Sequence, residues 1–170
     1  MSLLPRITTV FLILGLAACG FRPLYGDPGY RAADADYATV EVGDIAGHEG
    51  QLLTAAIEDR LNPKGEALPF EYKLNPTLNV QLVPLSFKED GTVTRYKVKV
   101  SSAYTLIRLQ DNKQIDHGIL RRSNSYNVSD ADYSTFVAQQ DSIKRAIESL
   151  GEKYFIRLSA FFAKNEHKKP

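Results

Sequence analysis

Residues 92–109, with the sequence TVTRYKVKVSSAYTLIRL, decide the fold because their side chains alternate in character. Successive residues of a β-strand point to opposite faces of the sheet. The stretch therefore predicts a long strand with one apolar face for the core and one basic face for solvent. The apolar face holds Tyr96, Val98, Val100, Tyr104 and Leu106, and the basic face holds Arg95, Lys97 and Lys99.

Turn-forming residues lie on both sides of this strand, KEDG at residues 88–91 and DNK at residues 111–113. Short polar turns of this kind join antiparallel neighbours in hairpins. We therefore expect residues 71–87 and 115–128 to be strands of the same antiparallel meander. Residues 71–87 contain two prolines, which cannot donate to a hydrogen-bond ladder, so we expect an edge strand or a strand broken by bulges there.

Helical patterns flank the meander. Residues 51–61 repeat apolar side chains at helical spacing, and a longer seam of the same kind runs from Phe136 to Phe161. A short β-branched strand at residues 38–42 precedes the first helix. The predicted order is β-α-β-β-β-α. It gives an α+β fold, a two-layer sandwich in which a mostly antiparallel sheet of about four strands packs on two helices.

The chain has the size of one domain. It contains 170 residues, of which 44% are hydrophobic and 24% are charged, and this composition is typical of a folded globular protein. We expect the single α+β domain over residues 38–164, followed by a C-terminal tail over residues 165–170. Gly151, inside the long helical seam, predicts a bend.

Charge and cysteine content exclude several functions. Lys and Arg number 21 and Asp and Glu number 20, and the resulting net charge of +1 argues against a nucleic-acid binder. One cysteine excludes an intramolecular disulfide and a multi-thiolate metal centre. The three histidines are isolated and no catalytic motif is present, so we expect no enzyme, no metal and no cofactor.

The N-terminus indicates export. Residues 1–18 have the pattern of a secretory signal peptide, with one Arg, a short apolar run and small residues at the end. The sequence LAACG at residues 16–20 resembles a bacterial lipobox. The resemblance implies that Cys19 becomes a mature N-terminus carrying a thioether diacylglycerol and an N-acyl chain, with residues 19–37 as a tether. The alternative is a buried, unmodified cysteine after an ordinary signal peptide.

The sequence CGFRPLYG at residues 19–26 is similar to the mature start of alphaproteobacterial lipopolysaccharide-assembly lipoproteins, the LptE-like family. The strand, glycine-rich and helical pattern over residues 40–61 and the long last helix extend this resemblance. It implies a non-enzymatic, lipid-anchored protein of the outer membrane. Such proteins plug the LptD β-barrel, form the lipopolysaccharide (LPS) translocon with it, assist barrel folding and contact LPS. The implied partners are therefore an LptD-type barrel, LPS and the membrane.

Basic residues on two predicted strands are the candidate LPS-binding residues: Arg95, Lys97, Lys99, Arg121 and Arg122. Cations spaced about 7 Å apart along a strand match the phosphates and carboxylates of an LPS core. The alternative is that these side chains keep a solvated strand soluble and protect a sheet edge from pairing.

A different function would also fit a lipid anchor. A free-standing periplasmic lipoprotein could bind a small lipid, or use a long tether to reach and activate a cell-wall synthase. The two hypotheses differ in the expected partner, which is an outer-membrane barrel in the first case and an inner-membrane synthase in the second.

Overall fold

The computed structural model describes residues 37–65 and 67–166. The expected signal peptide, Cys19 and the tether up to residue 36 lie outside these residues, as do residues 167–170 of the expected tail. Among the described residues, no helix is both long enough and apolar enough to cross a membrane.

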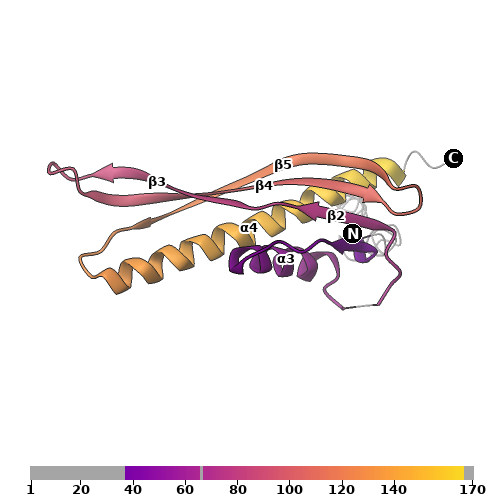
Figure 1. The fold of residues 1–170 in the computed structure, drawn as a ribbon, viewed down its shortest axis with the longest axis horizontal. Helices are drawn as coiled ribbons and strands as arrows, with labels where there is room; N and C mark the ends of the chain where they lie inside the picture. The colour runs from indigo at the N-terminus through magenta and orange to yellow at the C-terminus, as the bar shows by residue number, and fades with distance from the viewer. Residues whose placement is uncertain (1–36, 66, 167–170) are drawn as a thin grey trace, which may run out of the picture. The chain divides into compact units, whose positions relative to one another are not determined.

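One sheet covered by two helices makes up the described fold, which confirms the predicted α+β class (Figure 1). The order is β-α-β-β-β-β-α, because the stretch predicted as one strand before the first hairpin forms two strands. In chain order the elements are β1 (Val40–Val42), α3 (His48–Leu61), β2 (Tyr72–Pro76), β3 (Asn79–Phe87), β4 (Val93–Arg108), β5 (Lys113–Asn127) and α4 (Asp132–Glu166).

The long strand β4 is the centre of the sheet and confirms the predicted meander. It pairs with β5 along one edge, and with β2 and then β3 along the other. β2 and β3 keep the same register on β4, and between them the Thr77 N–H still donates to the Ala103 carbonyl at 2.8 Å. Pro76 ends β2, and a bulge follows Pro84 in β3. The proline-containing stretch is thus both interrupted and bulged.

The first strand departs from the antiparallel pattern. β1 pairs parallel with β2, with Val40 opposite Tyr72, and α3 forms the connection that a parallel pair requires. The sheet is therefore mixed. β1 is also shorter than the five residues expected, since only Val40–Val42 pair.

The apolar face of β4 lies against the helices and forms the core. Val98 and Leu106 have no exposed surface, whereas Lys99 on the opposite face is exposed. Removing this apolar surface from water supplies most of the driving force for folding. The fully buried apolar side chains include Leu53, Ile57, Leu74, Val98, Leu106, Ile147, Leu150, Tyr154 and Leu158.

The two ends of the predicted α4 seam differ from expectation. Phe136 is 58% exposed, because the first turns of α4 extend past the end of α3 (Figure 1). At the other end Phe162 is buried at 4% exposure, and Phe161 is only partly buried against the core. α4 runs to Glu166, so the tail expected from residue 165 begins inside the helix.

Gly151 marks a close helix contact, and α4 continues through it as one helix. A Cβ atom at this position would lie 2.9 Å from both the Cβ and the carbonyl oxygen of Ala56 on α3. Contacts under 3.0 Å are not found for real Cβ atoms. Glycine is therefore required by the distance between α3 and α4.

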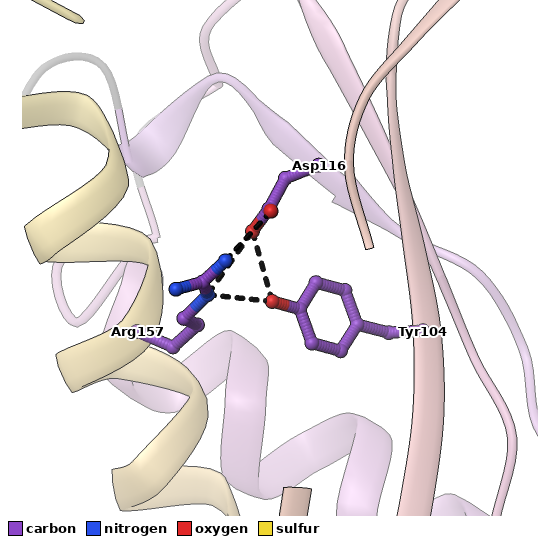
Figure 2. A network of polar contacts seen from close by, with 3 residues as sticks. All are labelled: Tyr104, Asp116 and Arg157. Carbon is purple, nitrogen blue, oxygen red and sulfur yellow. Dashed lines mark hydrogen bonds and ion pairs between the residues drawn. The ribbon is translucent and has the colours of Figure 1, made fainter. Parts of the chain in front are cut away.

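A polar network fixes α4 to the edge of the sheet (Figure 2). Arg157 donates from Nη2 to Asp116 Oδ1 at 2.7 Å and from Nε to the Tyr104 hydroxyl at 2.8 Å. The Tyr104 hydroxyl in turn donates to Asp116 Oδ2 at 2.8 Å. Burial raises the pKa of Tyr104, and the hydrogen bond to Asp116 raises the pKa of Arg157. Gly118, opposite Tyr104 in register, leaves room for the tyrosine ring, which would lie 3.2 Å from a Cβ there.

The last residue of the expected tether belongs to the core. Tyr37 is 5% exposed, and its ring centroid lies 5.6 Å from that of Phe155 and 5.7 Å from that of Phe162. The C-terminal half of α4 therefore holds the chain at the point where the described residues begin.

Candidate functional site

One face of the sheet lies away from the helices and is here called the open face (Figure 1). The register places four of the five predicted basic residues on it, and Arg122 is the exception. Because Val98 and Val100 are buried on the helix side at 0% and 1% exposure, the alternating residues Arg95, Lys97 and Lys99 must point the other way. Arg95 and Lys99 are exposed, and Lys97 is half-buried. The prediction that these three cations share one face is confirmed.

Pairing with β5 adds one of the two predicted arginines to this face. Arg121 lies opposite Ser101, which has the same orientation as Lys99, and its side chain is exposed. Arg122 lies opposite the buried Val100, and its Nε donates to the Ser149 carbonyl of α4 at 3.2 Å. The prediction that both arginines join the cations on β4 is therefore wrong for Arg122. Consecutive residues of a strand point to opposite faces, and this rule alone places Arg121 and Arg122 on different faces of the sheet.

A hollow of about 480 Å³ lies on the open face between the cations. Arg122 and Val100 also border it, although the Arg122 guanidinium is bonded on the helix side. No lining residue is acidic. The lining residues with the orientation of the open face are Gln81, Lys97, Lys99, Ser101, Arg121 and Ser123.

Three polar neighbours of the cations were not predicted from the sequence. Gln81 on β3 and Ser123 on β5 both lie opposite Lys99, one on each side, and Ser101 follows on β4 itself. Their amide and hydroxyl groups can bond an anion that the cations attract. The sequence signal for these three residues is alternation: residues at every second position of a strand share a face. The register between the strands is needed as well, because it shows which of them lie beside Lys99.

Arg95 stands at the far end of the row and is held in place. Its Nη2 and Nε both donate to the Ser125 hydroxyl, at 2.7 Å and 3.3 Å. Close by, Leu85 and Phe87 near the hairpin end of β3 are 42% and 59% exposed. The row of cations therefore ends beside apolar surface.

The chemistry available here is recognition of anions. Lys and Arg supply charge-assisted hydrogen bonds to phosphate or carboxylate groups, and no carboxylate on the lining competes with such a ligand. Within the described part of the chain, no group of three or more His, Cys, Asp or Glu residues could hold a metal ion.

Comparison with known proteins agrees with this architecture. A lipoprotein of Caulobacter crescentus CB15 is 24% identical with a TM-score of 0.66, over 82% of this chain and 98% of that chain. A minor lipoprotein of Acinetobacter baumannii is 17% identical with a TM-score of 0.58, over 73% and 92%. Lipoprotein B of Nitrosomonas europaea is 17% identical with a TM-score of 0.55, over 76% and 92%. These likenesses show a shared fold.

The sequence itself is matched by one family model. No curated protein sequence matches the chain. The model named LptE, described as lipopolysaccharide-assembly, matches residues 37–158, which include every strand and most of α4. The match covers well over half of the 170 residues. The chain therefore belongs to the LptE family of lipopolysaccharide-assembly proteins.

Proposed function

We propose that this protein is a lipid-anchored component of the outer-membrane LPS-assembly machinery. In this proposal it plugs an LptD-type β-barrel, assists the folding of that barrel and binds LPS, and it performs no catalysis. Membership of the LptE family supports the general role. The observation that carries LPS binding is the hollow on the open face, which gathers Lys97, Lys99 and Arg121 and has no acidic side chain among its described lining residues.

The anionic ligand in this proposal is the phosphorylated part of LPS. Its phosphates would bind the cations and the polar groups around them, because charge-assisted hydrogen bonds are the strongest kind available on a solvated face. The exposed Leu85 and Phe87 give an amphiphile apolar surface beside the end of the same row. If the cations served only to keep the strand soluble, neither a hollow between them nor exposed apolar side chains beside them would be needed.

The balanced charge of the chain supports the proposal that the domain lies inside a barrel. The lumen of a large outer-membrane barrel is polar, so a plug needs a hydrophilic exterior over a dry core. The chain has nearly equal numbers of basic and acidic side chains, and its described residues bury an apolar core between sheet and helices. A lipid on Cys19 would keep the domain next to the barrel at high effective concentration.

The LPS site is tested by removing its charges. In the full chain, we expect Lys97→Gln, Lys99→Gln and Arg121→Gln together to weaken LPS binding at least about tenfold, equivalent to about 1.4 kcal/mol. The matched control removes three cations from α4: Lys144→Gln, Arg145→Gln and Lys164→Gln. Binding is measured by titration of purified LPS at fixed salt. Equal loss in both variants would show that only net charge matters and would contradict this site.

The partner is tested by capture from detergent-solubilised envelopes of the native bacterium. We expect the intact chain to bring down a large outer-membrane barrel as its main partner. Capture of an inner-membrane cell-wall synthase in place of the barrel would overturn the proposal in favour of an activator.

The anchor is tested at Cys19. Mass spectrometry of the mature wild-type protein should show acylation of this residue, and Cys19→Ala should carry none. An unmodified thiol in the wild-type protein would remove the lipid anchor from the proposal.

A further inference from the structure

Among the described residues, β3 and β5 each pair with β4 only, so each leaves one edge unpaired. The register tells which of their backbone groups point outward. The Thr77 N–H donates to the Ala103 carbonyl, so residues of odd number on the β2–β3 side exchange bonds with β4. Even-numbered residues of β3 therefore turn their backbone groups away from β4. Pro84 is one of them, and it has no N–H to offer there.

On β5 the parity is reversed. The Val128 N–H, just after β5, donates to the Thr94 carbonyl, and the register makes even-numbered residues of β5 the partners of β4. The odd-numbered residues Ile119, Arg121, Ser123 and Ser125 consequently point their N–H and C=O groups away from the sheet. A strand of 15 residues with such an edge is a template for pairing with another chain.

Two side chains form hydrogen bonds with outward-pointing backbone groups of β5. Lys153 of α4 donates from Nζ to the Arg121 carbonyl at 3.3 Å. The Asn124 Oδ1 accepts the Ser125 N–H at 2.8 Å. An incoming strand would have to displace both side chains to form a continuous ladder.

We propose that Pro84, Asn124 and Lys153 guard the two edges against strand pairing with a second copy of this chain. A second copy is the relevant partner because it would bring an identical unpaired edge, and Ile119 beside the β5 edge, at 54% exposure, would give such a pair apolar surface. This proposal does not depend on the function proposed above.

The test removes the guards from the full chain purified in detergent. We expect Pro84→Val, Asn124→Ala and Lys153→Met together to raise the self-association constant at least about tenfold, equivalent to about 1.4 kcal/mol, in sedimentation equilibrium with density-matched detergent. The matched control makes similar changes on the exposed side of α4, Gln140→Ala and Lys144→Met. It should leave the self-association constant unchanged.

A rescue variant shows where the association occurs. Ile119→Lys, added to the unguarded chain, places a charge on the β5 edge and should restore the monomer. A folded, unguarded chain that stays as monomeric as the wild type would overturn the proposal, and so would association that Ile119→Lys leaves unchanged. Should the triple variant fail to fold by circular dichroism, Asn124→Ala and Lys153→Met alone give the same comparison on β5.

Discussion

Tyr154 joins α4 to the sheet through its hydroxyl, although the residue has no exposed surface. The hydroxyl lies 2.5 Å from Ser102 Oγ, and Ser102 donates onward to the Thr77 carbonyl at the gap between β2 and β3. Burial raises the pKa of Tyr154 to about 12, from an ordinary value of 10.0. A helix residue and two strand residues are thus coupled in one chain of hydrogen bonds.

This shift makes stability fall in alkali. Between about pH 10 and pH 12 the unfolded state releases the Tyr154 proton while the folded state keeps it, so the free energy of unfolding decreases as pH rises. Burial raises the pKa of Tyr104 and Tyr126 as well, and they act in the same direction. We expect Tyr154→Phe to cost about 1 kcal/mol at neutral pH and to flatten the alkaline slope. Urea unfolding across this range measures both, and an unchanged slope in the variant would contradict the assignment.

Ser142 on α4 offers a second prediction. It has no exposed surface, and its hydroxyl has no hydrogen-bond partner among the described residues. Ser142→Ala should therefore raise the free energy of unfolding by about 1 kcal/mol, since it removes an unpaired buried polar group and adds a better helix former. Ser159→Ala is the control, because that hydroxyl donates to the Phe155 carbonyl at 2.7 Å and should gain nothing comparable. Equal effects at both positions in chemical denaturation would count against this explanation.

The helices α3 and α4 make their closest described contact at Gly151 and Ala56, and this contact sets the distance between the two helices. We expect Gly151→Ala to destabilise the fold by about 1–3 kcal/mol, because its Cβ would overlap Ala56. At an exposed helix position the same change would gain about 1 kcal/mol. Thermal unfolding shows whether the Gly151→Ala variant is less or more stable than the wild type. The control is Glu152→Ala at the exposed neighbouring position, which should change the stability little. A stabilised Gly151→Ala variant would mean that α3 and α4 lie further apart.

Elements with a strong local pattern were predictable from the sequence. β4 and the meander follow from alternating side chains and polar turns, and the helical seams follow from their spacing. The parallel pairing of β1 was missed, because three residues carry no signal for direction of their own. The predicted helix between two strands was the available signal, since such a connection allows parallel pairing. Gly151 was predicted as a bend, since a sequence records the absence of a side chain but not the neighbouring helix that requires it.

At the scale of the whole molecule, the register decides which charges meet. Three cations follow one another on β4 and were assigned to one face from the sequence alone. The opposite orientation of Arg121 and Arg122 follows from alternation, but Gln81 joins the hollow only because β3 pairs with β4 at Lys99. The alternating pattern fixes the face on which each side chain lies, and the turn lengths and bulges decide which residues lie opposite each other.

The fold presents two faces with separate tasks in this account. One face is covered by α3 and α4, which form the core together with the strands, and Arg157 of α4 bonds Tyr104 and Asp116 of the sheet (Figure 2). The open face carries the cations and is left for a ligand. The proposed function uses both faces: a plug needs a core that is stable without a large apolar exterior, and the proposed LPS site needs one face left open.

Depletion of the protein in its native bacterium tests the central claim most directly. LPS at the cell surface is measured by labelling of intact cells while expression of the wild-type chain is shut off. If the chain assembles LPS at the outer membrane, surface LPS falls as the protein disappears, and re-expression of the wild-type chain restores it. Surface LPS that stays at its normal level in fully depleted cells would contradict the account.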